Sequence, residues 1–466
     1  MESKLLRPLS QAVALALAAG GAHAASITVT DGGDVGTAST CTLRQATVSA
    51  NADSAQGTCA AGSGADTITF AAGLANSTIT LQYGQLLIDS SVTISGSGQT
   101  IVAGGNSRVM AIYSANTVAS VTVSDLTLTG GSYNGPGAGL AIKYGNGPAV
   151  PTSRPQRSIL APTAAGPNVT LNQVTIGNNT SNYEAGGLFI SNATVAINQS
   201  SITGNTLNAS GNYGAGGVYI AEGSAVTITD STISGNSASG GFGFLTGGVY
   251  VYGSALAVTN STVTGNSASG GIDLAGGISL ENSSAGIYNS TVTGNTTTGS
   301  NVSAGGILVG AEASASLNIF NSILANNTGT QANMGVFNSN VVAQSNLMGT
   351  TLSGLFAGNG NVFSDAPGLG ALANNGGPTL TMLPQPGSPA LGAGNAALTP
   401  AGVTTDQRGA GFPRVANGVL DIGAVQATAA APIATPTPTP ALSRWAMLAL
   451  AGLLGLFGLR KRRRTG

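Results

Sequence analysis

Charged side chains are scarce in this chain. Asp, Glu, Lys and Arg make up only 7% of its 466 residues, whereas Gly alone occurs 71 times. A soluble domain usually carries about 25% charged residues, so solubility must depend here mainly on Ser, Thr and Asn. This composition favours flat, stacked β-structure, and the length allows a large buried core.

Cations are scarcer still once the two ends of the chain are set aside. Residues 25–440 contain seven Lys and Arg against fifteen Asp and Glu. This excess of acidic residues argues against binding to the phosphate backbone of a nucleic acid, so we expect no nucleic-acid partner.

The N-terminal residues 1–24 have the layout of a secretory signal peptide. A basic start precedes an apolar run, which ends in the small-x-small sequence Ala22-His23-Ala24. We expect signal peptidase to remove this segment, and the only His of the chain with it.

Potential metal ligands are nearly absent from the rest of the chain. Cys41 and Cys59 are its only cysteines, and no His remains to complete a zinc site. We therefore expect no metal and no cofactor. In an exported protein the two cysteines are predicted to form a disulfide, which would stabilise the fold by roughly 3 kcal/mol.

The C-terminal residues combine a Pro/Thr linker (427–440) with an apolar helix and a basic end (441–466). The apolar run is predicted to be a transmembrane helix with its basic end in the cytoplasm. Its entrance resembles the IPTL-CTERM and PEP-CTERM sorting tails of Gram-negative bacteria through Pro440, Ala441, Leu442, Ser443 and Trp445. The resemblance implies a cell-surface or extracellular protein, held in the membrane until an exosortase-type protease cuts the tail. A plain membrane anchor is the alternative.

Residues 25–70 are expected to cap the N-terminal end of a solenoid. The hexapeptide Cys41-Thr42-Leu43-Arg44-Gln45-Ala46 resembles the signature of the CSLREA domain, which occurs near the start of extracellular β-helical proteins. Residues 65–70, ADTITF, are predicted to form the first strand.

A repeat of 26 to 32 residues dominates the middle of the chain. Six units align on the Asn of a GN-like pair, and aliphatic residues stand three and eight positions before each Asn. A GG pair opens a second apolar block in each of five units. We interpret each unit as three short strands that bury their apolar side only when stacked. The prediction is an all-β, right-handed parallel β-helix, with irregular coils over 71–130, a Pro-rich excursion loop over 131–168 and regular coils over 169–371.

Two features of the repeat are candidates for a role beyond packing. A polar column six positions before the aligned Asn is predicted to form a structural ladder, although a sugar or calcium site is the alternative; its members are Gln173, Gln199, Asp230, Asn260, Asn289 and Asn321. The segments between GN and the next GG are predicted to be loops along one edge. Their aromatic residues Tyr213, Phe242 and Phe244 are candidates for binding, with packing of the loops as the alternative.

Residues 372–426 change character and are predicted to form a C-terminal cap over the open edge of the last coil. Their NNGGPT, PGSPAL, TDQRG and DIGAVQ motifs resemble the choice-of-anchor Q domain of bacterial surface proteins. Asp406, Arg408, Arg414 and Asp421 are interpreted as an ion-pair network that fixes this cap rather than as a catalytic cluster.

The sequence predicts a structural or adhesive protein, not an enzyme. The six regular units contain no Lys, Arg or His to serve as a base, and their closest carboxylate pair is Glu281 and Glu312, interpreted as exposed turn residues. We expect the loop edge to bind a surface polysaccharide, a matrix or another cell. A carbohydrate-active enzyme on the same fold and a self-associating matrix component are the alternatives.

Overall fold

The structure, a computed structural model, describes residues 24–114, 119–145, 166–211, 213–240, 243–299, 302–310, 315–354 and 356–427. Apart from residues 24 and 427, the predicted signal peptide, the linker and the C-terminal apolar helix lie outside these residues. Among the residues that are described, no helix has the length and apolar character needed to cross a membrane.

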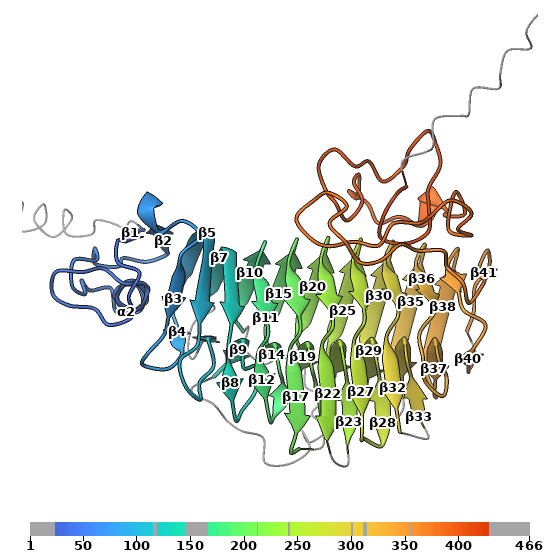
Figure 1. The fold of residues 1–466 in the computed structure, drawn as a ribbon, viewed down its shortest axis with the longest axis horizontal. Coiled ribbons are helices and arrows are strands. Elements are labelled where there is room, and N and C mark those ends of the chain that lie inside the picture. Colours follow the sequence, from blue (N-terminus) through green and yellow to red (C-terminus); the bar gives the residue numbers. More distant parts are fainter. Residues whose placement is uncertain are drawn as a thin grey trace, which may run out of the picture. The chain divides into compact units, whose positions relative to one another are not determined.

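The chain folds as an all-β parallel β-helix, as the repeat predicts (Figure 1). One regular coil consists of β20 (Ala225–Thr229), β21 (Thr232–Ser234), β22 (Ser237–Gly240), β23 (Phe244–Thr246) and β24 (Val249–Tyr252). The expectation of three strands per unit is therefore wrong. The two additional strands, β22 and β23, come from the segment that was predicted to be a loop.

Stacking of the coils produces four sheets, which we number in chain order. Sheet 1 has twenty strands, two from each regular coil: β1 (Ser26–Val29), β2 (Asp66–Phe70), β3 (Thr78–Thr80), β5 (Val92–Val102), β7 (Ser120–Thr129), β10 (Asn168–Asn172), β11 (Thr175–Gly177), β15 (Thr194–Asn198), β16 (Ser201–Thr203), β20, β21, β25 (Ala255–Thr259), β26 (Thr262–Thr264), β30 (Ser284–Tyr288), β31 (Thr291–Thr293), β35 (Ser316–Phe320), β36 (Ile323–Ala325), β38 (Asn340–Gln344), β39 (Leu347–Met348) and β41 (Val362–Phe363).

The other three sheets take one strand from each coil that contributes. Sheet 2 has six strands: β8 (Ser132–Tyr133), β12 (Thr180–Ser181), β17 (Thr206–Ala209), β22, β27 (Ser267–Ser269) and β32 (Thr296–Thr298). Sheet 3 has five: β13 (Glu184–Ala185), β18 (Tyr213–Ala215), β23, β28 (Asp273–Ala275) and β33 (Val302–Ala304). Sheet 4 has ten: β4 (Leu86–Ile88), β6 (Met110–Ser114), β9 (Leu140–Tyr144), β14 (Leu188–Ser191), β19 (Val218–Ala221), β24, β29 (Ile278–Glu281), β34 (Ile307–Val309), β37 (Met334–Val336) and β40 (Leu352–Ser353).

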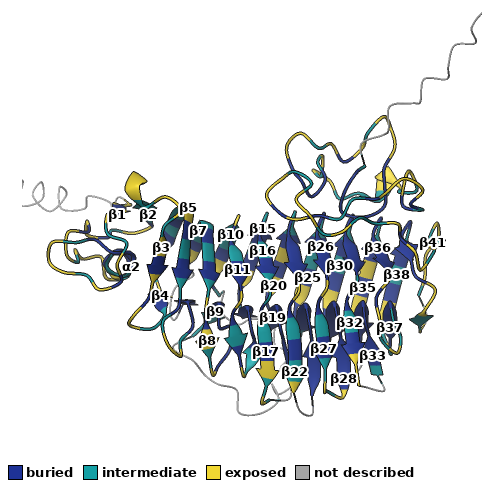
Figure 2. Ribbon diagram, viewed as in Figure 1, coloured by how far each residue is buried: buried dark blue, intermediate teal, exposed yellow. Residues whose placement is uncertain are grey.

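The aliphatic columns seen in the sequence set the register of sheet 1. The residues three positions before each aligned Asn pair directly from coil to coil, as predicted: Ile176, Ile202, Ile233, Val263, Val292 and Leu324. Their side chains are at most 1% exposed, and Figure 2 shows the buried residues running along the stacked strands. Each such side chain contributes about 2 kcal/mol through burial, which only stacking can supply.

The GG pair marks the corner where the chain passes from sheet 3 to sheet 4. A Cβ atom at Gly216 would lie 2.5 Å from the Ser237 carbonyl oxygen, and one at Gly217 would lie 2.6 Å from the Gly248 oxygen. Adjacent coils therefore approach too closely at this corner for any side chain, which explains why the pair recurs in successive units.

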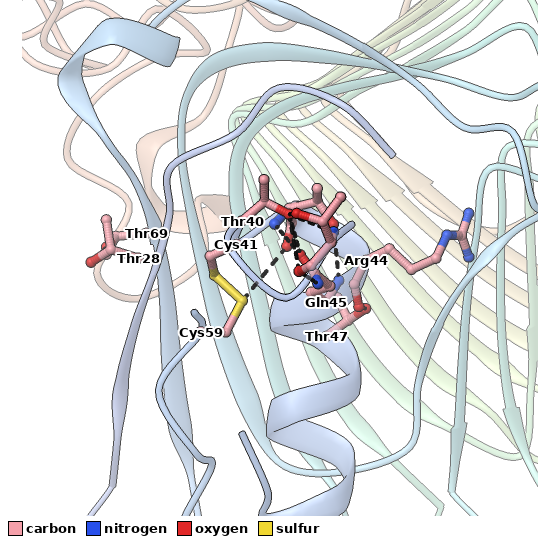
Figure 3. Close-up of a disulfide and its surroundings, with 10 residues drawn as sticks. Thr28, Thr40, Cys41, Arg44, Gln45, Thr47, Cys59 and Thr69 are labelled. Atoms are coloured by element: carbon pink, nitrogen blue, oxygen red, sulfur yellow. Dashed lines mark hydrogen bonds between the residues drawn. A yellow bond between two sulfur atoms is a disulfide. The ribbon is translucent and has the colours of Figure 1, made fainter. Parts of the chain in front are cut away.

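The N-terminal region packs a helix, α2 (Leu43–Ala52), against the first strands (Figure 3). Thr42 caps α2, and the Gln45 side chain accepts a hydrogen bond from the Thr42 amide at 3.0 Å, which completes a capping box. Cys41 and Cys59 form the predicted disulfide. The expectation that residues 65–70 form the first strand is wrong, because β1 precedes β2 and pairs with it in parallel.

The region predicted to be a Pro-rich excursion loop is partly inside the stack. Residues 131–145 contribute β8 to sheet 2 and β9 to sheet 4, and β9 pairs in register with both β6 and β14. The remaining part, residues 146–165, lies outside the described residues. Pro136 lies in the part that joins the stack, where its carbonyl accepts from Arg108 at 3.1 Å, so proline content alone does not mark an excursion from the coils.

The C-terminal segment, residues 372–427, is largely irregular, and its one short helix is the 3₁₀ helix η2 (Ala396–Leu398). Its hydrogen bonds run along the flank of the solenoid: the Thr379 hydroxyl donates to the Asp230 carbonyl at 3.0 Å, and Gly423 N donates to the Asn321 carbonyl at 2.8 Å. It therefore covers the second strands of sheet 1 in successive coils (Figure 1). This differs from the predicted position over the last coil. The Thr side chains on the outer face of β21 and β26 are buried under this segment.

Two arginines fix the C-terminal segment internally. Arg408 pairs with the fully buried Asp406 at 2.7 Å and lies 3.9 Å from the centre of the Phe412 ring. Arg414 instead donates to the carbonyl oxygens of Asp421 and Gly423. The predicted network is thus one ion pair joined to backbone hydrogen bonds.

Candidate functional site

The predicted polar ladder has a different role from the one expected. All six members of its column adopt left-handed backbone conformations, with φ between 47° and 55°. Asn260 donates to Asp230 at 3.2 Å and Gln173 donates to Gln199 at 3.4 Å, but neither side-chain amide atom of Asn289 has a partner among the described residues. Asn321 binds the backbone of Asn395 in the C-terminal segment. The column is therefore a series of corner residues rather than a continuous ladder.

A continuous ladder does exist. It runs along the Asn residues of the GN-like pairs, on which the six units align. The side-chain Nδ2 of each donates to the Oδ1 of the next at 2.9 Å, through Asn179, Asn205, Asn236, Asn266, Asn295 and Asn327. Each accepting Oδ1 also receives the backbone N–H of the preceding Asn, at 3.0 or 3.1 Å. All six are buried, so this ladder stabilises the stack and is closed to ligands.

Sheets 2 and 3 pack face to face where a loop edge was predicted. Their small core consists of Leu207, Ala238, Leu245, Ala268 and Leu274. Segments such as SASG in β22 and SAS in β27 have little tendency to form strands alone, and their pairing depends on in-register stacking on neighbouring coils. The surface available for function is therefore the outer side of a sheet.

Aromatic side chains gather on the outer face of sheets 3 and 4. Residues of sheet 4 alternate, so that Val218 and Ile220 enter the core while Tyr219 points outward. The rings of Tyr219 and Tyr250 stack at 5.0 Å, and those of Tyr213 and Phe244 stack at 5.3 Å. We call these side chains, together with Phe189, the aromatic cluster.

The predicted binding residues belong in part to this cluster. Phe244 is 9% exposed and is held between its neighbours, whereas Tyr213 is half-buried and lies at the margin of the cluster. Phe242 lies outside the described residues. The structure thus gives Phe244 a packing position and leaves an edge of Tyr213 at the surface.

Acidic residues collect on the same face. Glu184 begins β13, Asp273 begins β28, Glu281 ends β29, and Glu222 follows β19. Four of the six acids in the regular units therefore share one face; of the other two, Glu312 lies outside the described residues and Asp230 lies under the C-terminal segment. Glu281 is only 2% exposed, so its interpretation as an exposed turn residue is wrong. It ends a strand of sheet 4, in register with Tyr252, and lies close to the buried Tyr250.

One lysine, Lys143, lies on the same face as these acids. This position was not predicted from the sequence. Lys143 was assigned to the excursion loop, but it lies on β9, in register with Ser191 on β14. Ser191 donates a hydrogen bond to Glu222 Oε2 at 2.5 Å. Burial raises the pKa of Glu184 to about 8; the nearby Glu222 carboxylate adds to the rise, and Lys143 opposes it. Glu184 is therefore mainly protonated at neutral pH.

Two buried tyrosines of the cluster, Tyr219 and Tyr250, remain neutral at any ordinary pH. Burial raises the pKa of Tyr219 and of Tyr250 well above the usual value, and nearby carboxylates add to the effect. In the described part of the chain, no three His, Cys, Asp or Glu residues are grouped so that they could hold a metal ion. The outer face of sheets 3 and 4 therefore combines a buried layer of tyrosines and acids with a smaller set of accessible groups: the exposed Glu222 and the half-buried Lys143, Glu184, Tyr213 and Tyr252.

Two shallow depressions on the solenoid are weaker candidates. One, of about 400 Å³, lies on the outer face of sheet 1 over small residues such as Ala196, Ala257 and Gly286. The other, of about 620 Å³, follows the corner between sheets 4 and 1 and is lined by Ser, Gly, Ala and Asn. Among the described residues, Tyr288 is the one ionisable residue that lines the first depression, and none lines the second. Neither depression therefore has groups suited to catalysis or to binding a charged ligand.

Comparison with known proteins identifies the tail and the fold. The IPTL-CTERM motif matches residues 437–464, which include the predicted motif from Pro440 to Trp445. No curated protein matches the chain. The crystal structure of pectate lyase Pel9A is similar with a TM-score of 0.50 and 13% identity, over 87% of this chain and 97% of that one. At that identity the similarity shows the parallel β-helix fold alone. The sorting tail indicates an exported, surface-associated protein that a sorting protease system processes.

Proposed function

We propose that this protein binds a surface polysaccharide through the outer face of sheets 3 and 4. The observation that carries the proposal is the concentration of acids and tyrosines there, in a chain with only 7% charged residues. Partial burial of carboxylates costs free energy, so packing alone gives no reason to place Glu184 and Glu281 on this face. Convergent polar groups beside aromatic rings are typical of ligand sites.

The groups that a glycan would reach form a short set. Glu222 is exposed, while Lys143, Glu184, Tyr213 and Tyr252 are half-buried. Beneath them the other rings of the aromatic cluster pack tightly, which keeps the surface groups in place. The rest of the molecule is a rigid scaffold, with the Asn ladder inside and the capped helix α2 at its N-terminal end. Membership of the two end regions in the CSLREA and choice-of-anchor Q families, right-handed coiling and membrane attachment through the tail stay predictions.

A glycan array tests the proposal. The purified full-length chain should bind one class of polysaccharide, and Tyr213→Ala together with Glu222→Gln should weaken that binding at least ten-fold. Asp53→Asn, at the exposed C-terminal end of α2, is the matched control and should bind as the unmodified protein does. Equal binding by the double variant, or binding to no glycan, would contradict the proposal.

A carbohydrate-active enzyme is the second candidate, and one observation favours it. Glu184 and Glu222 are neighbouring carboxyl groups, of which Glu184 is held protonated by burial and Glu222 is exposed. Such a pair is the arrangement that glycosidases use for an acid and a nucleophile or base. Release of new reducing ends from a bound glycan, abolished by Glu184→Gln, would establish the enzyme; binding without cleavage would favour the adhesive function.

A further inference from the structure

We infer that the ligand of the outer face of sheets 3 and 4 is a glycan that carries free amino groups. The inference rests on the proposed function and adds the chemical class of the ligand. The charge of the face, unpartnered polar atoms within it and the rings beside them all favour such a ligand.

The charge of the face is negative. Glu184, Glu222, Asp273 and Glu281 lie on it, although Glu184 is mainly protonated at neutral pH and adds little charge there. Lys143 is half-buried and is the cation among the described residues of the face that is not fully buried. Arg108 lies beyond Tyr113 at the N-terminal end of the face, but it is 1% exposed, and its guanidinium donates to the Tyr113 hydroxyl and to the carbonyl of Gly137. A polymer of uronic acids would meet net repulsion here, whereas an ammonium group would be attracted.

Two buried oxygen atoms on this face have no hydrogen-bond partner among the described residues. One is Glu184 Oε2, and the other is Oγ1 of Thr246, whose residue is 1% exposed. Thr246 stands in register with Ala215, which packs against the aromatic cluster, so its hydroxyl is directed to the same side of sheet 3. Natural proteins rarely leave such atoms unpaired. The Thr246 hydroxyl oxygen and the unprotonated oxygen of the Glu184 carboxyl group can both accept, and an ammonium group supplies three donors and no acceptor.

The aromatic rings indicate that the amine belongs to a sugar. Tyr213 stacks on Phe244, and the half-buried Tyr252 stands in register with Glu281. Aromatic rings attract both the apolar face of a sugar and a cation placed over the ring. Since the coils stack along the solenoid axis, successive units of an extended chain would meet successive coils.

Calorimetry with three hexasaccharides tests the inference: glucosamine, N-acetylglucosamine and galacturonic acid oligomers, each with and without EDTA. The full-length chain should bind the glucosamine oligomer at least ten-fold more tightly than the acetylated one, with an affinity that falls as salt is added. It should not bind the galacturonic acid oligomer. Glu222→Gln should remove most of the preference for the free amine.

Lys143→Gln provides the control against misfolding. Removing a like charge should tighten binding of the glucosamine oligomer several-fold, and a damaged fold cannot produce a gain. Equal affinity for both amino-sugar oligomers would overturn the inference while leaving the proposed function intact. Preference for the galacturonic acid oligomer, with or without a need for calcium, would also overturn it, and binding of no oligosaccharide would argue against the proposed function itself.

Discussion

Replacing Asn266 by Ala tests whether the buried ladder holds the coils together. Asn266 Nδ2 donates to the Ile233 carbonyl at 3.0 Å and to Asn295 Oδ1 at 2.9 Å. Its Oδ1 accepts from the backbone N–H of Asn236 at 3.0 Å and from the Asn236 side chain at 2.9 Å. The substitution removes four buried hydrogen bonds, and at roughly 1 kcal/mol each the free energy of unfolding should fall by about 4 kcal/mol.

Urea denaturation followed by far-UV circular dichroism measures this loss as a shift of the midpoint. Amide hydrogen exchange at the backbone N–H of Asn236 should accelerate in parallel, because that group loses its acceptor. Asn289→Gly is the matched control: its side-chain amide has no partner among the described residues, and glycine accepts its φ of 47° without strain. Its effect should stay within about 1 kcal/mol. A change below about 1 kcal/mol for Asn266→Ala would refute a stabilising role for the ladder.

Three further predictions concern other parts of the molecule. The pKa of Glu184 is raised from 4.5 to about 8 in the folded state, so the folded protein keeps a proton that the unfolded chain has lost, and stability should fall by on the order of 4 kcal/mol as the pH rises between these values. Glu184→Gln should abolish that fall in urea titrations repeated at pH 5 and pH 9; an unchanged slope would show that Glu184 is not the group responsible. Joint replacement of Cys41 and Cys59 by Ser should cost roughly 3 kcal/mol, seen as a lower urea midpoint that added reductant does not lower further. Gln407 bridges the C-terminal segment to the Thr262 hydroxyl at 2.6 Å, so Gln407→Ala should accelerate protease cleavage within residues 372–427 while the coils stay intact, and unaltered cleavage would contradict the importance of that contact.

The regular coils could be predicted because apolar residues repeat in the sequence wherever side chains meet in the core. Ile202 and Ile233, for example, pair directly in the structure. The ladder was assigned to the wrong column because two Asn-rich columns stand six residues apart, and sequence alone does not tell which one turns inward. The additional strands of sheets 2 and 3 were missed because segments such as β22 consist of Ser, Ala and Gly, whose pairing depends on their stacked copies.

The acidic face could not be assembled from the sequence, because its members come from different coils and from opposite sides of residues 146–165. Lys143 is close in sequence to that Pro-rich stretch and was therefore predicted to be part of the loop. In the structure it lies on β9, directly in register with Ser191 on β14. The sequence also contains no sign of which strands the C-terminal segment covers. Outward Thr residues on β21 and β26 look like solvent-facing positions until another part of the chain is found to cover them.

The flank position of the C-terminal segment has a mechanical consequence. Tension applied through the tail would enter the described structure at Ala427, whose amide is held by Asp421 at 2.7 Å. From there the segment's bonds reach coils from Asp230 to Asn321, so the pull would be shared among several coils in shear. A solenoid pulled by its terminal coil would instead peel one coil at a time, since each coil contacts only its neighbours. The segment would thus distribute any force that reaches it through the tail over several coils.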